Sequence, residues 1–151
     1  MRLYLVQHGE AKSKDEDPER PLTEKGIKDV QKVAGFVSKS IPSLNEIRHS
    51  GKLRAKQTAE IIGKHLKFSY LIAVKGMAPL DDVVPIAKEL TKENKDLMLV
   101  GHLPFMEKLA AKLLFDDPNA SAVKFKKGGI VCLEMENDTW KVCWMVTPDM
   151  I

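Results

Sequence analysis

Two short runs of consecutive apolar residues constrain the fold of this chain most strongly. They occupy residues 3–6 (Leu-Tyr-Leu-Val) and 97–100 (Leu-Met-Leu-Val). Runs of this length that are apolar at every position are typical of strands buried on both faces, as in a parallel sheet covered by helices on each side. The sequence therefore predicts a parallel β-sheet at the centre of the molecule.

The segments between and after these runs carry apolar residues at helical spacing. Thr23 is placed to cap a first helix that should end before Pro42, and a second helix should start near Leu53. A third should run from residue 82 to about residue 94, and Pro104 suits the first turn of a fourth. The inward-facing residues of the first, second and fourth helices should be Ile27, Val30, Val33, Ala34 and Val37; Ala55, Ala59, Ile62 and Leu66; and Met106, Leu109, Ala110, Leu113 and Leu114.

The last part of the chain changes to a pattern of strands. Residues 130–136 and 139–146 should form an antiparallel hairpin that turns at Asn137-Asp138, and residues 46–50 are a weaker candidate for a short strand. Strands that alternate with helices and end in a hairpin predict an α/β fold, a three-layer α/β/α sandwich with a mainly parallel sheet. No repeat or composition shift divides the chain, so residues 1–151 are expected to form one domain.

The register of this hairpin carries two further expectations. Cys132 and Cys143 should lie opposite one another, although a disulfide between them is disfavoured in a reducing compartment. Trp140 and Trp144 are four residues apart on one strand and should share one face of the sheet.

Composition excludes several classes of function. The 24 basic and 21 acidic side chains leave a net charge of +3, too small and too dispersed to indicate a nucleic-acid partner. The N-terminal run meets Gln7 and His8 too soon for a cleavable signal peptide, and no apolar run approaches the roughly 18 residues of a membrane span. The two cysteines lie too far from any histidine for a zinc site of the usual spacing. We therefore expect a cytoplasmic protein.

Two histidines follow the two apolar runs, His8 after the first and His102 after the second. The carboxyl ends of parallel strands meet at one edge of a sheet, where ligands bind, so both imidazoles should emerge on the same rim. Arg20 precedes one predicted helix and Arg54 lies in the first turn of another. Helix N-termini and guanidinium groups both bind phosphate, so the four side chains together predict an anion pocket.

At these positions the sequence resembles the histidine phosphatase superfamily, and within it the small SixA-type phosphohistidine phosphatases. Each matching segment is short, but they occur in the family's order and span nearly the whole chain. The segments are Leu5-Val6-Gln7-His8-Gly9-Glu10-Ala11, Arg20-Pro21-Leu22-Thr23-Glu24-Lys25-Gly26, Leu53-Arg54-Ala55-Lys56-Gln57-Thr58-Ala59 and Val100-Gly101-His102-Leu103-Pro104.

The resemblance implies a phosphoglycerate-mutase-like fold and a specific set of roles. His8 falls on the family's nucleophile, His102 on its second pocket histidine, and Arg20 and Arg54 on its phosphate-binding arginines. No metal or other cofactor is expected, because side chains supply the cations. The nucleophile needs its other ring nitrogen to donate a hydrogen bond, which we expect to go to a backbone carbonyl near Gly9.

One position departs from the family pattern, since Gln7 stands where the family usually has arginine. Loss of a guanidinium removes a charge-assisted hydrogen bond of about 1.5–3 kcal/mol. A glutamine amide still donates a hydrogen bond to phosphate. We therefore expect binding or turnover weakened by about one to two orders of magnitude rather than abolished chemistry.

For several other polar residues, the sequence gives weaker evidence of a role in the site. Glu10, Asp81 and Asp82 are candidates for a general acid, although carboxylates at helix starts are more often capping groups. His49 is expected to play a surface role and His65 to lie in the last turn of a helix. Three lysines could form a basic lip to the pocket or a solvated edge: Lys124, Lys126 and Lys127.

Three functions fit these residues. The first is dephosphorylation of phosphohistidine on a protein, as in signalling, because a compact chain leaves the pocket open to another protein's side chain. The second keeps the chemistry but takes a small phosphoester. The third is a binding module that senses phosphate without turnover. It is suggested by Gln7, which replaces the family's usual arginine.

Overall fold

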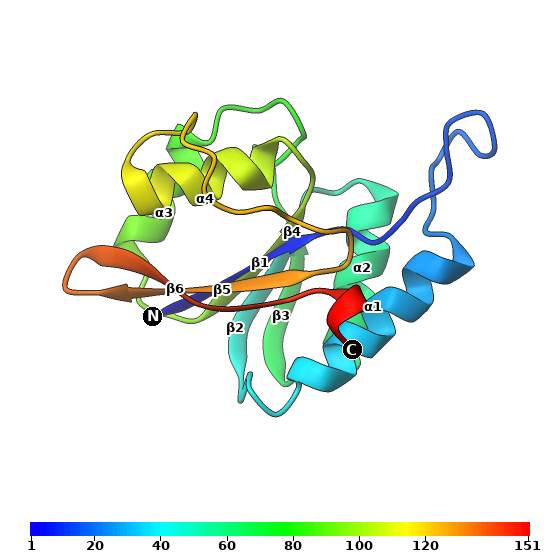
Figure 1. Cartoon of the computed structure of the whole chain (residues 1–151), viewed down its shortest axis with the longest axis horizontal. Helices are drawn as coiled ribbons and strands as arrows, with labels where there is room; N and C mark the ends of the chain where they lie inside the picture. Colours follow the sequence, from blue (N-terminus) through cyan, green and yellow to red (C-terminus); the bar gives the residue numbers. More distant parts are fainter.

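The computed structural model describes residues 1–151 and contains one six-stranded sheet in the order β3-β2-β4-β1-β5-β6 (Figure 1). The central strands run parallel: β1 pairs with β4, and β2 pairs with β4 and β3. β5 is antiparallel to β1 and to β6, which confirms the C-terminal hairpin. The strands are β1 (Arg2–Gln7), β2 (Leu44–His49), β3 (Phe68–Ala73), β4 (Leu97–Gly101), β5 (Ile130–Glu136) and β6 (Thr139–Val146).

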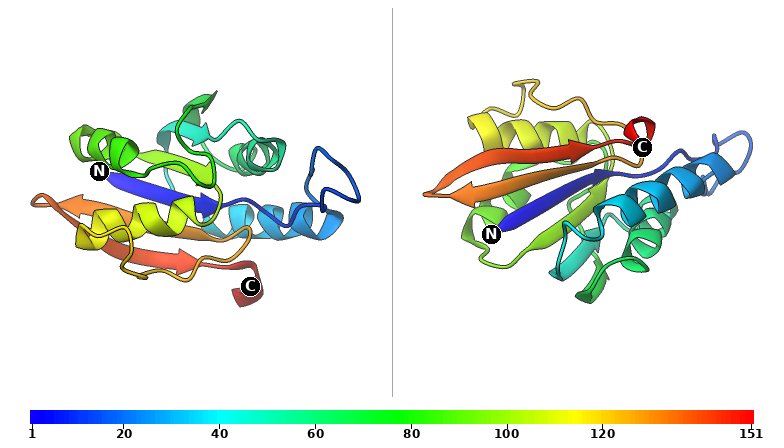
Figure 2. Two further views of the ribbon diagram at one scale, coloured as in Figure 1. Left: turned by 90° about the horizontal axis from the view of Figure 1, so that it is seen from above. Right: turned by 60° about the horizontal axis from the view of Figure 1, so that its bottom comes forward.

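Helices cover both faces of this sheet, as the predicted three-layer fold requires (Figures 1 and 2). One face carries α1 (Glu24–Val37) and α2 (Leu53–Gly63), and the other carries α3 (Val84–Lys92) and α4 (Phe105–Phe115). The short 3₁₀ helix η1 (Pro148–Met150) ends the chain beside α1. None of these helices combines the length and apolarity needed to cross a bilayer.

The side chains of β1 divide between the two layers of the core. Leu3 and Leu5 pack in the cluster under α3 and α4, whereas Tyr4 and Val6 pack in the cluster under α1 and α2. Successive side chains of a strand point to opposite faces, so a strand that is apolar at every position must be covered on both. β1 is fully buried from Leu3 to Val6, as its sequence predicts.

The start of α1 is fixed against the loop that follows β1. The Thr23 hydroxyl accepts a hydrogen bond from the Gly26 amide at 2.9 Å, which confirms the predicted cap. A side chain at Gly26 would have no room, because its Cβ would lie 2.2 Å from the carbonyl oxygen of Glu10. An isolated antiparallel bridge between Ala11 and Leu22 closes the loop formed by residues 12–21. The loop after β1 and the start of α1 therefore form one packed unit.

Several boundaries differ from the sequence-based expectations. α2 ends at Gly63, so Leu66 lies beyond it and His65 is not in its last turn. α3 begins at Val84 rather than at residue 82, and Pro104 is the N-cap of α4 rather than a residue of its first turn. The strand β3 is absent from the expectations. It lies at the edge of the sheet and is mostly exposed, so it lacks the burial pattern that marks the other strands.

A β-bulge in the hairpin overturns two expectations. The register shifts between Cys132 and Leu133, so that Cys132 lies opposite Trp144 instead of Cys143. Both cysteines are free, Cys132 buried and Cys143 exposed. The extra residue also reverses the alternation along β6. Trp140 therefore packs in the cluster under α3 and α4, while Trp144 packs against the opposite cluster.

Candidate active site

The two predicted histidines meet at the carboxyl ends of adjacent strands. Gln7 on β1 is in register with Gly101 on β4, and His8 continues the ladder by donating from its amide to the Gly101 carbonyl at 3.0 Å. The imidazole rings of His8 and His102 lie 5.0 Å apart between centroids. Both side chains are buried, which makes this rim of the sheet a site rather than a solvated edge.

The hydrogen bond of His8 defines its tautomer. Nδ1 lies 2.7 Å from the carbonyl oxygen of Gly9, as predicted. A carbonyl oxygen only accepts, so in the neutral ring Nδ1 carries the proton and Nε2 keeps its lone pair. Nε2 is thus the nitrogen available for nucleophilic attack.

The surroundings of both rings favour their neutral forms. Burial lowers the pKa of His8 to about 4, and the charges of Arg54 and Arg20 act in the same direction, against the raising effect of the Gly9 hydrogen bond. Burial also lowers the pKa of His102 to about 3, with further contributions from His8 and Arg54. Two neutral imidazoles beside cationic side chains are suited to an anionic ligand and, at His8, to nucleophilic chemistry.

Arg20, in the loop before α1, and Arg54, on α2, are close enough for the charge of one to act on the other. Arg54 is the second residue of α2, and its buried Nε has no hydrogen-bond partner in the protein. Burial lowers the pKa of Arg54, and Arg20 lowers it further. Neither guanidinium forms an ion pair with a carboxylate. Like charges held together without a counterion create a local site for phosphate oxygens.

Arg20 is positioned by an unusual backbone conformation. Its φ of 51° lies in the left-handed region, which non-glycine residues adopt at a cost. The Nε of Arg20 donates to the carbonyl of Lys12 at 3.0 Å, which ties the guanidinium to the loop after β1. The strain is therefore located at a residue whose charge acts on His8, His102 and Arg54.

Thr58 connects the nucleophile loop to the helix that carries Arg54. Its buried hydroxyl accepts from the Gly9 amide at 3.0 Å and donates to the Arg54 carbonyl at 2.8 Å. Our sequence reasoning gave Thr58 no role. The available signal is its spacing, because a residue four positions after Arg54 lies on the same side of the helix.

Ser50 is a second contact that the sequence reasoning missed. Its hydroxyl oxygen lies 2.6 Å from Nε2 of His102 and accepts from the Lys52 amide at 3.3 Å. Nδ1 of His102 is buried and has no partner in the protein. A serine that already accepts from an amide is suited to donate to Nε2, which leaves Nδ1 as the protonated nitrogen. The signal was the position of Ser50 directly after β2, at the same rim.

A cavity of about 670 Å³ lies next to the site. Its wall does not include the four predicted side chains, which are His8, Arg20, Arg54 and His102. Gln7, Glu10 and Leu103 form part of its wall where it meets the site. The Gln7 side chain is 7% exposed, and its Oε1 has no hydrogen-bond partner in the protein. The other lining residues are Lys25, Asp29, Lys32, Phe125, Lys126, Lys127, Pro148 and Asp149. Of the three lysines that could form either a basic lip or a solvated edge, Lys126 and Lys127 line this cavity and Lys124 does not.

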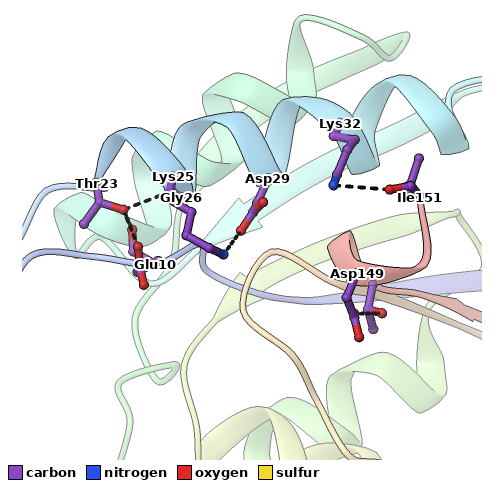
Figure 3. Close-up of polar contacts among 9 residues, drawn as sticks. Glu10, Thr23, Lys25, Gly26, Asp29, Lys32, Asp149 and Ile151 are labelled. Carbon is purple, nitrogen blue, oxygen red and sulfur yellow. Dashed lines mark hydrogen bonds and ion pairs between the residues drawn. The ribbon is translucent and has the colours of Figure 1, made fainter.

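The three candidate acids are placed differently. Glu10 lines the cavity, and its carboxylate accepts from the Thr23 hydroxyl at 2.7 Å (Figure 3). Asp81 accepts from the Ala78 amide at 2.8 Å and Asp82 from the Val84 amide at 3.0 Å, so both close turns within their own exposed loop. Of the three, Glu10 alone shares a cavity wall with Gln7.

His49 differs from its expected surface role. It is 4% exposed, and its Nδ1 accepts from the Gly51 amide at 3.1 Å. This bond shapes the turn between β2 and α2, the turn that also carries Ser50. Elsewhere in the chain, no three His, Cys, Asp or Glu side chains gather into a group that could hold a metal ion.

Comparisons with known proteins show the family and the fold of this chain. The model of the histidine phosphatase superfamily (branch 1) matches residues 3–83, which include His8, Arg20 and Arg54. An uncharacterized protein of Picosynechococcus sp. is 31% identical over 88% of this chain and 84% of its own. The phosphohistidine phosphatase SixA of Escherichia coli K12 is 26% identical over 98% and 94%. A solved structure of SixA complexed with tungstate has a TM-score of 0.85 at 22% identity, covering 99% of both chains, which confirms the phosphoglycerate-mutase-like fold.

Proposed function

Because the chain belongs to the histidine phosphatase superfamily, we propose that it is a phosphatase that forms a phosphohistidine on His8 and acts on phosphohistidine in a protein. The single observation that supports this most directly is the hydrogen bond between Nδ1 of His8 and the Gly9 carbonyl. It leaves Nε2 unprotonated in a ring whose pKa is about 4, so the nucleophile is in its reactive form at neutral pH.

The reaction proceeds in two displacements. The Nε2 lone pair attacks phosphorus as the bond from phosphorus to the leaving nitrogen breaks, and that nitrogen keeps the electron pair. The Gly9 carbonyl stabilises the positive charge that develops on the His8 ring. Water then attacks the phosphoryl group, the bond from phosphorus to Nε2 breaks, and inorganic phosphate leaves while the water's proton is released.

Three side chains would stabilise the charge that spreads over the phosphoryl oxygens. Arg20 and Arg54 supply guanidinium donors, and His102 supplies its Nδ1–H, held toward the site by the contact of Nε2 with Ser50. The Gln7 amide adds a neutral donor. With two side-chain cations present, we propose that turnover requires no metal ion and persists in the presence of a chelator.

A phosphohistidine substrate suits the state of Glu10. Its imidazole leaves without the strong acid that an alkoxide needs, and the Glu10 carboxylate is already engaged by Thr23. The same substrate class appears in the name of the SixA relative. A small phosphoester is the alternative substrate, and for it Glu10 would be the acid.

Trapping the covalent intermediate tests the chemistry. Substrate labelled in the phosphoryl group, mixed with excess enzyme and quenched in alkali, should leave acid-labile phosphate on His8, and His8→Ala should abolish it. His65→Ala is the matched control and should retain the label. Binding and release of unchanged substrate, with no effect of His8→Ala, would instead establish a phosphate-sensing module.

A substrate comparison tests the specificity. A phosphohistidine protein should be hydrolysed with a higher kcat/KM than a panel of sugar phosphates, nucleotides and phosphoamino acids. A clear preference for one ester would transfer the assignment to the small-molecule alternative while leaving the role of His8 intact.

A further inference from the structure

The cavity beside Gln7 carries more unpaired positive than negative charge. Asp29 pairs with Lys25 at 2.7 Å (Figure 3). Glu10 and Asp149 keep their negative charges, because they accept only from the hydroxyls of Thr23 and Thr147. The lining therefore carries four lysines against three carboxylates, an excess of one positive charge. The three remaining lysines that line the cavity form no ion pair, and Lys32 only approaches the Ile151 carbonyl at 3.4 Å. They are Lys32, Lys126 and Lys127, and we call this cavity the lysine groove.

The lysine groove lies beside the end of β1, where Gln7 forms part of its wall next to His8. The amide of Gly128 donates to the carbonyls of Gln7 at 3.0 Å and of His8 at 3.3 Å, so the loop that bears Lys126 and Lys127 is fixed to the end of β1. The charge of Lys127 is one of the contributions that lower the pKa of His8. The charges of Arg54 and Arg20 lower the same pKa, so the cations of the phosphoryl site and of the groove act on one ring.

The chemistry of the groove fits a protein segment better than a small anion. Its cations are exposed lysines, which act as mobile point charges, whereas small phosphates and carboxylates are gripped by arginine forks of fixed geometry. Leu103, Phe125 and Pro148 add an apolar floor between the charges. Charged groups at a protein contact set the rate of encounter and the choice of partner.

From these observations we infer that the lysine groove binds an acidic segment next to the phosphohistidine of a protein substrate. The inference rests on the proposed function and adds a recognition element to it. The acidic side chains pair with Lys32 and Lys126 while the phosphorylated imidazole enters the site beside Gln7. Gln7 Oε1, buried and unpartnered at the junction, accepts a hydrogen bond from the backbone of the bound segment.

Two synthetic peptides test the groove. Each has a single histidine phosphorylated with phosphoramidate, flanked by glutamates in one and by lysines in the other, and free phosphohistidine serves as the third substrate. For the wild type at low ionic strength, kcat/KM should be about tenfold or more higher for the glutamate peptide. The ratio should approach one at about 0.5 M salt, because exposed charges are then screened.

Charge reversal assigns the effect to particular lysines. Lys126→Glu and Lys32→Glu should each lower the glutamate-to-lysine ratio by about fivefold or more. The matched controls are Lys124→Glu, in the same loop but outside the groove, and Lys39→Glu, exposed beyond the C-terminal end of α1. Both should keep the wild-type ratio and the wild-type rate with free phosphohistidine. Equal rates for both peptides at low salt, or equal effects of the controls, would refute the groove. Failure to hydrolyse any of the three substrates would refute the proposed function instead.

Discussion

The amide of Gly9 donates to the hydroxyl of Thr58 across 3.0 Å, and this buried contact joins the loop that holds the nucleophile to the helix that carries Arg54. Gly9 thereby has two functions: its carbonyl orients His8 and its amide is anchored to α2. One hydroxyl group therefore joins the backbone next to His8 to the backbone of Arg54.

Replacement of Thr58 by valine tests this coupling. Thr58→Val keeps the shape but leaves the Gly9 amide without an acceptor, which should lower the free energy of unfolding by about 1–3 kcal/mol and kcat/KM by about tenfold or more. Thr91→Val is the control, because Thr91 only donates to the Ala87 carbonyl on α3. Urea denaturation and steady-state kinetics measure both effects. A Thr58→Val enzyme with unchanged kcat/KM would show that the contact is purely structural.

The ionisation of His8 can be measured directly. Ring NMR resonances followed from pH 8 downward should show His8 titrating near pH 4, rather than near the ordinary histidine pKa of 6.5, and the ¹⁵N shifts at pH 7 should report a protonated Nδ1. A pKa close to 6.5 would contradict the burial seen here.

The same pKa makes stability depend on pH. Between pH 6.5 and about pH 4 the unfolded chain binds a proton at His8 that the folded chain does not, so His8 alone should lower the free energy of unfolding by about 1.4 kcal/mol for each pH unit of acidification. His102, whose pKa is about 3, should contribute in the same direction over this window. His8→Gln should show a smaller dependence over the same window, since it removes the His8 contribution.

Ser50 is expected to act through His102. Ser50→Ala removes the partner of Nε2, so the ring is free to rotate or to change tautomer, and kcat/KM should fall by about tenfold. Ser50→Thr keeps the hydroxyl and should restore most of the activity. Ser38→Ala, which removes an exposed bond to the Gly35 carbonyl, is the control. If Ser50→Ala destabilises the fold but leaves kcat unchanged, Ser50 does not position His102.

Gln7→Arg tests the departure from the family pattern. An arginine at this position should strengthen inhibition by inorganic phosphate by about tenfold or more, because it adds a charge-assisted hydrogen bond. Gln31→Arg adds the same charge on the exposed surface of α1 and should change the inhibition constant little. Unchanged affinity in Gln7→Arg would show that side chains at position 7 do not reach the phosphoryl group.

Two glycines of α1 should respond in opposite directions to alanine. Gly26→Ala places a methyl group 2.2 Å from the Glu10 carbonyl and should cost several kcal/mol and displace the loop after β1. Gly35→Ala meets nothing closer than 4.0 Å on the exposed side of the helix and should stabilise the protein by about 0.5–1 kcal/mol. Thermal denaturation of the two variants measures the contrast. Similar changes in both would contradict the close approach of α1 to Glu10.

The strands and helices that build the core could be predicted because burial on one or two faces leaves a period in the sequence. β1 and β4 show this burial as continuous apolar runs and α1 as a helical period. Because the carboxyl ends of parallel strands meet at one edge of a sheet, His8 and His102 could then be placed together. β3 could not be predicted in this way, since it pairs with β2 alone and buries little. The bulge in β6 also leaves no local signal, and it alone separates Trp140 from Trp144.

The parts of the site that were missed depend on contacts between elements. Ser50 meets His102 because β2 and β4 are neighbours, and Thr58 meets Gly9 because α2 packs against the loop after β1. Both are short polar side chains that sequence alone assigns equally well to caps or turns. The family resemblance pointed to the charged and imidazole groups proposed to contact the phosphoryl group, and not to the residues that hold them.

The reversal of strand direction at β5 has a practical consequence. Because β5 is antiparallel to β1, the segment before β5 reaches the rim, whereas the turn at Asn137-Asp138 lies at the opposite end of the sheet. A fluorophore or an affinity handle inserted at that turn would leave the rim accessible for measurements. Changes in the length of residues 116–129 would instead remodel the entrance, which makes this segment the natural target for redesigning partner choice.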